Sequence, residues 1–328
     1  MMFLLEGVDT YKIHEPLFEG TRVILSYLNE DYTPAYIQGI SGAAFRIGGI
    51  CPCAPTCTYA MQPVELLKIL GYKAKHFNLC SEGKSINTHW DEMISNIKKE
   101  LLDNRPVLVW NAFSFGEWDV VCGFDDSEEV FLGRGSNTDI GRYSKSKYKH
   151  TKELNDIPAF GAIFIGEKIF NLNKENAEIS ALKEAVKHAY TKEKGGKLNI
   201  KCKGWDFYEG IQCYQRWSDA FKTTIDKKRT AGDTYCYNVY SSTHKTASEF
   251  LREIAPNYSN AKHYLLKASD CFYNEVDILL QGKSMIDCDS GEEYDKLRNK
   301  NLSEIINKAC DEYAKGIDWI KKAIEFMC

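Results

Sequence analysis

The sequence predicts an α+β domain followed by an all-helical domain, and two observations indicate this order. Short β-rich runs joined by Asp, Gly and Ser turns gather between residues 107 and 165, which is typical of an antiparallel sheet. After Asn171, nearly every segment has the periodicity of an amphipathic helix. Because strands come first and helices second, we expect residues 1–171 to form one domain and residues 172–328 a helical bundle.

The composition is that of an ordinary globular protein. The chain has 328 residues, of which 44% are hydrophobic and 27% charged, and its length fits two domains of about 150 residues. The formal net charge is −4 and there is no basic stripe, so we expect no nucleic-acid partner. No run of about 18 apolar residues occurs, so we expect no membrane partner either.

The twelve cysteines are expected to be reduced. The apolar start of the chain, Met1 to Leu5, is short and no basic residue precedes it. It therefore favours a first β-strand over a secretory signal. Without such a signal a disulfide framework is not expected, and we predict a cytoplasmic protein with mostly buried thiols.

The first part of the α+β domain mixes helix and strand signals. Residues 21–28 fit either a β-rich run or a short helix, and residues 34–39 predict a strand that enters a turn. Ser41 then occupies the N-cap or first position of an expected helix. The patterns that follow predict a helix over 62–70, a strand over 73–79 and a helix from Asn87 or Thr88 to Leu102.

The clearest strand and helix patterns lie further along the chain. Strands are predicted at 107–110, 118–124, 130–132 and 159–165. Helices are predicted at 175–192, 206–222, 233–254, 260–280 and 302–327.

The segment from Pro106 to Asp126 resembles the core hairpin of bacterial papain-like peptidases, including bacteriocin-processing peptidases. A Pro-Val-Leu-Val-Trp strand is followed by a short loop and the run Trp118-Asp-Val-Val-Cys-Gly-Phe-Asp. In the resembled family the residue before this run is the catalytic histidine. Here that position is Glu117, and the resemblance implies that the usual base is replaced.

The nucleophile expected of that family is also replaced. A papain-like mechanism needs a thiolate at a helix start, where the helix dipole lowers the thiol pKa, and an imidazole within hydrogen-bond reach. The predicted helix start carries Ser41, in Gly-Ile-Ser-Gly-Ala-Ala-Phe-Arg. A carboxylate such as Glu117 is too weak a base to activate a serine hydroxyl, so ordinary proteolysis is not expected.

The chain as a whole resembles the butirosin-biosynthesis acyltransferase type, which pairs a peptidase-like domain with a helical tail. The resemblance is carried by residues 39–46, by residues 117–126, by Gly204-Trp-Asp-Phe-Tyr in the tail, and by Ala247-x-Glu-Phe-Leu-Arg. It implies an enzyme that moves an acyl group from a thioester to an amine. In that interpretation Ser41 or Cys51 is the nucleophile and Glu117 is an acid, a base or a positioning group.

The cysteine-rich segment 51–57 has three alternatives. Cys51, Cys53 and Cys57 are soft metal ligands, but a fourth ligand is not obvious, so we expect no metal and no cofactor. Cys51 could face the same cleft as Ser41 and act as a nucleophile. The third alternative is a thiol-rich loop that covers the cleft.

Three further side chains are predicted to bind the ligand: Arg46, Trp118 and Arg134. Arg46 is the expected ion partner of Glu117, because a buried carboxylate needs a counter-charge. Arg134 follows the third strand and suits a carboxylate or phosphate, or else a surface turn. The seven histidines are predicted to be surface or packing residues.

Two functions remain open from the sequence. The first is a non-catalytic protein that binds a small molecule or a peptide in the former active-site cleft, with the helical part as a lid or homodimer interface. The second is an acyltransferase, or a hydrolase of amides or thioesters, that uses Ser41 or Cys51.

Overall fold

The structure is a computed structural model that describes residues 1–48, 61–79, 86–136, 141–149, 161–192, 208–223, 231–286 and 296–327. The chain divides into two compact units. Unit 1 comprises Met1–Ile37 and Gln62–Asn173, and unit 2 comprises Gln38–Met61 and Lys174–Cys328. The division after Asn173 lies close to the predicted boundary at 171, but residues 38–61 belong to the helical unit and not to the sheet unit.

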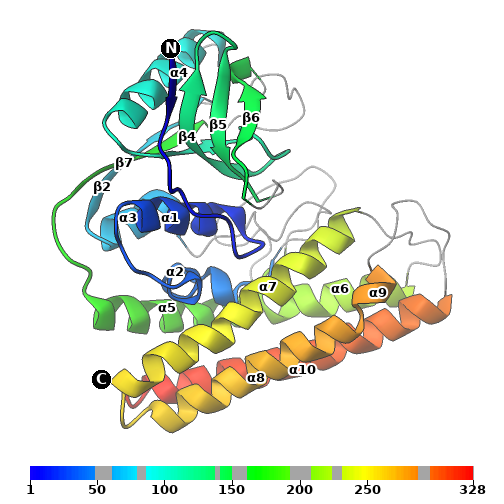
Figure 1. Ribbon diagram of the computed structural model, residues 1–328. Helices are drawn as coiled ribbons and strands as arrows, with labels where there is room; N and C mark the ends of the chain where they lie inside the picture. The colour runs from blue at the N-terminus through cyan, green and yellow to red at the C-terminus, as the bar shows by residue number, and fades with distance from the viewer. Residues whose placement is uncertain are drawn as a thin grey trace. The chain divides into compact units, whose positions relative to one another are not determined.

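Unit 1 is an α+β domain built on an antiparallel sheet of seven strands, as the β-rich runs predicted (Figure 1). The strand order is β2-β7-β3-β4-β5-β6, and β1 pairs with the second half of β4. The strands are β1 (Met2–Leu4), β2 (Tyr72–Phe77), β3 (Val107–Trp110), β4 (Trp118–Asp125), β5 (Val130–Arg134), β6 (Ser144–Lys147) and β7 (Ala162–Lys168).

The centre of this sheet is buried on both faces. In β4 seven consecutive residues from Trp118 are buried, and β3 is buried except at Trp110. Three helices of unit 1 cover it: α1 (Pro16–Tyr27) and α4 (Ile86–Leu102) pack on β3 and β4, and α3 (Pro63–Ile69) packs on β2 and β7. The β3–β4 hairpin therefore lies in the close-packed interior of unit 1.

The first helix, α1, resolves the ambiguity of residues 21–28. Glu15 is its N-cap, with side-chain oxygens that accept the N–H groups of Leu17 and Phe18, and Pro16 supplies a favourable first residue. The local start signal and tertiary packing on the sheet outweigh the β-propensity of the Val-Ile-Leu run.

The predicted strand at 34–39 is wrong, because this segment forms helix α2 (Pro34–Ile40). Thr33 begins it, since its hydroxyl accepts the N–H of Tyr36 at 2.9 Å, and Pro34 follows as the first helical residue. The helix predicted to start at Ser41 is also wrong. Gly42 has a left-handed backbone (φ 80°), which ends α2, and only a short 3₁₀ turn, η1 (Ala43–Phe45), follows.

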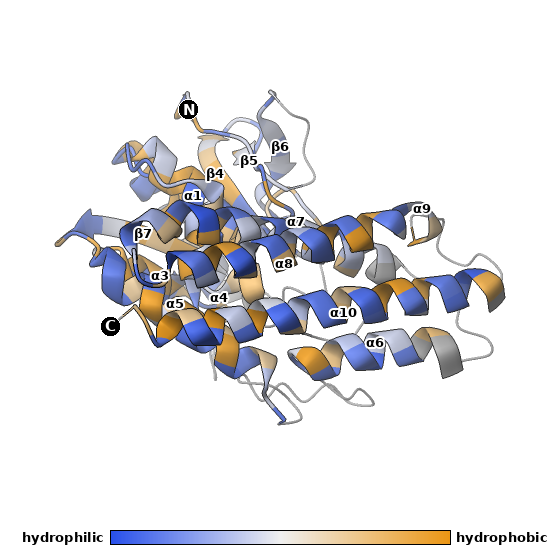
Figure 2. Ribbon diagram, turned by 90° about the horizontal axis from the view of Figure 1, so that it is seen from below, coloured by the Kyte–Doolittle hydropathy of each residue, from blue (hydrophilic) through white to orange (hydrophobic). Residues whose placement is uncertain are grey.

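Unit 2 is a bundle of long amphipathic helices, in agreement with the sequence pattern after residue 171 (Figure 1). α8 packs along both α7 and α10, and α10 also packs on α5 and α6. Figure 2 shows hydrophobic and hydrophilic residues alternating around α8 and α10, as expected for helices with one buried stripe. The helices are α5 (Lys174–Ala189), α6 (Ile211–Thr223), α7 (Ala231–Ile254), α8 (Lys262–Gln281), α9 (Lys283–Ile286) and α10 (Lys296–Ile324).

Within the described ranges, no helix is both long enough and apolar enough to span a bilayer.

Candidate functional sites

The six residues predicted from the sequence are divided between the two units. Glu117, Trp118 and Arg134 belong to unit 1, whereas Ser41 and Arg46 belong to unit 2. Cys51, like Cys53 and Cys57, lies outside the described residues. A cleft shared by Ser41 and Glu117 therefore stays a prediction.

Ser41 is fully buried and its hydroxyl is engaged locally. The Oγ atom donates to the carbonyl oxygen of Gln38 at 3.0 Å and accepts the N–H of Ala43 at 3.3 Å. These contacts end α2 rather than start a helix, so Ser41 does not have the helix dipole that a papain-like nucleophile uses.

Arg46 pairs with a carboxylate that the sequence did not suggest. Its Nη2 atom donates to Oε1 of Glu209 at 2.7 Å, and both side chains are 4% exposed. Burial lowers the pKa of Arg46, and the Glu209 carboxylate opposes this. The predicted ion pair of Arg46 with Glu117 joins residues of different units and stays a prediction.

Trp118 and Arg134 serve the packing of unit 1. The Trp118 ring makes edge contacts with Trp110 and His76 and is 5% exposed. The Arg134 guanidinium donates to the carbonyl oxygens of Val8 and Arg142 and lies 3.9 Å over the Tyr143 ring. Arg134 is therefore a buried residue and not part of a surface turn.

Glu117 ends a loop that backbone and side-chain contacts hold tightly. The carbonyl oxygen of Glu117 accepts the N–H of Asn111 at 2.6 Å, and the Asn111 side chain accepts the N–H of Gly116 at 2.8 Å. Asn111 and Gly116 both have positive φ, 57° and 68°. The Glu117 side chain is 8% exposed, so it is not the solvated loop carboxylate that its position beside Gly116 would suggest.

The buried side chain of Asp119 accepts hydrogen bonds from the backbone of the same loop. Its Oδ2 atom accepts the N–H of Phe113 at 2.7 Å and that of Ser114 at 2.9 Å. Its Oδ1 atom is buried and has no hydrogen-bond partner among the described residues. Burial raises the pKa of Asp119 to about 7, although the N–H groups of Ser114 and Phe113 favour the ionised form.

The phenol of Tyr11 is under the electrostatic influence of several carboxyl groups of unit 1. The Tyr11 hydroxyl donates to the carbonyl oxygen of Trp118 at 3.0 Å. Burial raises the pKa of Tyr11 well above its usual value, and four carboxyl groups raise it further. We call these four residues the acidic cluster: Asp119, Glu19, Glu15 and Glu117.

A buried arginine, Arg22, pairs with one member of the acidic cluster, Glu19. Arg22 donates to Glu19 at 2.9 Å and also to Asp9 at 2.9 Å. Even so, burial raises the pKa of Glu19, and its Oε2 atom has no hydrogen-bond partner in the described part of the chain. Asp119 and Glu19 thus each bury a carboxyl oxygen without a hydrogen-bond partner among the described residues, which is costly unless a proton or a ligand compensates.

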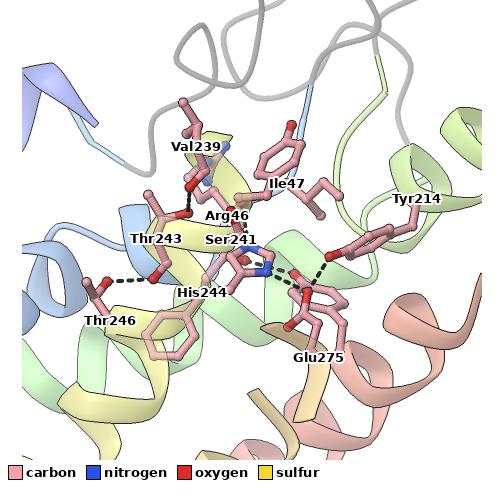
Figure 3. Close-up of polar contacts among 12 residues, drawn as sticks. Arg46, Ile47, Tyr214, Val239, Ser241, Thr243, His244, Thr246 and Glu275 are labelled. Atoms are coloured by element: carbon pink, nitrogen blue, oxygen red, sulfur yellow. Dashed lines mark hydrogen bonds and ion pairs between the residues drawn. The ribbon is translucent and has the colours of Figure 1, made fainter. Parts of the chain in front are cut away.

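Unit 2 contains a second polar network, centred on His244 (Figure 3). The Nδ1 atom of His244 lies 2.6 Å from Oε1 of Glu275, and its Nε2 atom lies 3.0 Å from the carbonyl oxygen of Arg46. The Tyr214 hydroxyl donates to the same Glu275 oxygen. Neither His244 nor Glu275 is exposed, so the network lies in the interior of unit 2, out of contact with bulk water.

The hydrogen bonds define the charge on His244. A carbonyl oxygen only accepts, so Nε2 must carry a proton. Glu275 accepts from Tyr214 as a carboxylate does, and Nδ1 then donates as well. Burial alone would lower the pKa of His244, but the Glu275 carboxylate raises it above its usual value. Both observations indicate an imidazolium paired with a carboxylate.

Four of the described thiols are poor nucleophiles, because burial raises their pKa. The pKa rises to about 12 for Cys122 and Cys310, to about 11 for Cys271, and well above its usual value for Cys213. Within the same ranges no three His, Cys, Asp or Glu side chains are arranged to hold a metal ion.

Sequence reasoning missed most of these residues. Glu15 had a usable signal, since a carboxylate directly before a proline and an apolar helical run is a typical N-cap. Asp119 and Glu19 lie within strand and helix patterns that do not reveal burial. His244 and Glu275 come together only through the packing of α7 on α8. Compared with known protein families and with curated proteins, the chain matches none of them.

Proposed function

We propose that the protein binds a small molecule or a peptide that carries an amine, and that unit 1 is a papain-like scaffold without a Cys/His dyad. The single observation that carries this proposal is the acidic cluster. Two of its buried members, Asp119 and Glu19, each have a carboxyl oxygen with no hydrogen-bond partner among the described residues, and burial raises the pKa of both.

The start of α1 supports a non-catalytic role. In a papain-like site the thiolate occupies the N-terminus of a helix, where N–H groups and the dipole stabilise its charge. At the start of α1 the Glu15 carboxylate already accepts the N–H groups of Leu17 and Phe18. The N-terminus of α1 thus holds a carboxylate, and no thiolate occupies this position.

An ammonium group is the ligand chemistry that fits the cluster. It supplies positive charge together with several N–H donors, which a carboxylate and a carbonyl oxygen can accept. The cluster offers carboxyl oxygens beside the Trp118 carbonyl, and Glu117 is its most exposed member at 8%. We infer that the amine approaches over Glu117.

Calorimetric titration of the full chain tests this function. We expect 1,4-diaminobutane or a lysine dipeptide to bind and succinate not to bind. Glu117→Gln should weaken amine binding at least about tenfold, which corresponds to about 1.4 kcal/mol. Glu167→Gln is the matched control, because Glu167 is an exposed carboxylate of the same unit, paired with Lys73.

The alternative acyltransferase or thioester hydrolase function gives a different result. A small acyl thioester would be consumed by the wild-type chain, and Ser41→Ala or Cys51→Ala would abolish the reaction.

In the calorimetric titration, binding of succinate instead of the amines would contradict the proposed ligand chemistry. Equal binding of the amines to the wild type and to the Glu117→Gln variant would also contradict it.

A further inference from the structure

Residues 45–48 begin at the last residue of η1, Phe45, and continue with extended backbone at Arg46. Groups from other parts of unit 2 hold their backbone. The carbonyl oxygens of Phe45, Arg46 and Ile47 accept from Tyr313, His244 and Gly210 at 2.9, 3.0 and 2.8 Å. The N–H of Ile47 donates to Nε2 of His188 at 3.0 Å. The N–H and the carbonyl of Gly48 both bond to the Tyr240 hydroxyl.

We call residues 45–48 the captured strand and the groups that hold it the strand-binding set. The set consists of His188 on α5, Gly210 before α6, Tyr240 and His244 on α7, and Tyr313 on α10. These groups come from four separate positions in the bundle. Beyond the end of η1, the captured strand forms an isolated bridge between Gly48 and Glu209 and belongs to no sheet of the described residues.

Two side chains of the captured strand are also recognised. The Phe45 ring makes edge contacts with Phe250 and Phe272, with centroid distances of 6.1 and 5.5 Å. The Arg46 guanidinium forms the buried pair with Glu209. An aromatic ring and an arginine that are fully desolvated are typical anchors of a bound peptide.

The protonation states of the two histidines in the strand-binding set suit the binding of a peptide backbone. His188 accepts from Ile47 at Nε2, and burial, together with Arg46, lowers its pKa well below the usual value, which keeps the ring neutral. His244 is an imidazolium and donates to Arg46. The two histidines are therefore fixed as one acceptor and one donor for adjacent backbone groups, which sets the register of the strand.

We propose that the helices α5–α10 form a peptide-binding module for an extended segment with an aromatic residue followed by arginine, and that residues 45–48 are its resident ligand. Backbone hydrogen bonds supply affinity and the two side-chain contacts supply specificity, as in other recognition of extended peptides. The attachment of the strand to the same chain gives it a high effective concentration, so an outside peptide competes only when the resident strand is weakened.

The test is rescue by a peptide in trans on the full chain. Phe45→Ala removes the ring from its contacts with Phe250 and Phe272 and should lower the melting temperature of unit 2 by about 10 °C. Melting of unit 2 can be followed separately by pulsed hydrogen exchange of peptides from α8 and α10. A synthetic peptide of residues 41–48, added at millimolar concentration, should restore at least half of the lost melting temperature.

Two control peptides define the specificity. The same peptide with Phe45→Ala, or with Arg46→Glu, should not restore the melting temperature. If Phe45→Ala does not fold, Phe45→Leu makes a smaller defect for the same titration. An unchanged melting temperature in the variant, or no rescue by the wild-type peptide, would overturn the proposal.

Discussion

The Nε2 atom of His244 lies 3.0 Å from the carbonyl oxygen of Arg46, a residue 198 positions earlier in the chain. The opposite ring nitrogen lies 2.6 Å from Glu275. A histidine on α7 thus connects a carboxylate on α8 to the backbone of the captured strand (Figure 3). This relationship ties the folding of the bundle to a segment from the first part of the sequence.

Replacing the imidazole should strongly destabilise unit 2. His244→Phe leaves the buried Glu275 carboxylate without its cation and the Arg46 carbonyl without its donor. We expect a loss of about 3–5 kcal/mol in the free energy of unfolding, the range for breaking a buried ion pair. Urea unfolding followed by circular dichroism measures it. His263→Phe, the same substitution at an exposed position of unit 2, should change the stability by less than about 0.5 kcal/mol.

The stability of unit 2 should fall as the solution becomes alkaline. The pKa of His244 is raised in the folded protein above its ordinary value of 6.5, so the folded state holds the proton more tightly. Its stabilising contribution is complete below pH 6.5 and is lost as the pH rises through the folded pKa. Unfolding free energies measured from pH 6 to pH 9 should decline in the wild type and decline less in His244→Phe. Parallel curves for the two proteins would contradict a charged His244.

The close approach of α2 to α7 leaves no room for a side chain at Gly39. A Cβ atom there would lie 2.2 Å from the Phe250 ring, and a ring cannot bend away as a flexible side chain does. Gly39→Ala should destabilise unit 2 by about 1–3 kcal/mol. In a Phe250→Leu background the same change should cost less, because part of the ring is gone. A double-mutant cycle measures this coupling, and strictly additive effects would count against the contact.

Asp119 should make unit 1 less stable as the pH rises through the acidic range. Its folded pKa of about 7 exceeds its ordinary value of 3.8, so protons favour the folded state and stability declines between about pH 4 and pH 7. The decline amounts to up to about 4 kcal/mol, since one pKa unit corresponds to about 1.4 kcal/mol. Asp119→Asn keeps an acceptor for the loop and should make this slope smaller, leaving the part that Glu19 contributes through its own raised pKa.

Asp126→Asn is the matched control for that measurement. Asp126 is an exposed carboxylate of unit 1 that pairs with Lys98, and this hydrogen bond holds its pKa below the usual value. Its contribution has the opposite sign, because it is lost as the pH falls. A slope between pH 4 and pH 7 that is as steep in Asp119→Asn as in the wild type would contradict a raised pKa of Asp119.

The secondary structure was predictable where the pattern was long and periodic. The helices α7, α8 and α10 and the strands β3, β4 and β5 lie within a few residues of their predicted positions, apart from an earlier start of α10. The strand β6, with the sequence Ser-Lys-Ser-Lys, was missed because an edge strand needs no apolar face. The helix α2 was missed although Thr33 and Pro34 are a capping residue and a favourable first residue.

The candidate sites were less predictable, because they depend on contacts between distant residues. Glu117 was correctly singled out by its place before the Trp118 strand, but its burial beside Asp119 and Tyr11 follows from the packing of α1 on the sheet. The pairing of Arg46 with Glu209 joins residues 163 positions apart. No local pattern in the sequence reports such a pair.

Amide hydrogen exchange of Ile47 and Gly48 in the full chain tests most directly whether the strand-binding set binds residues 45–48. Both N–H groups donate to buried side chains, His188 and Tyr240, so each should exchange only when unit 2 opens. The expected result is protection equal to that of core amides of α7, such as Phe250. Exchange of Ile47 and Gly48 at the rate of an unstructured chain, while α7 stays protected, would contradict the captured strand.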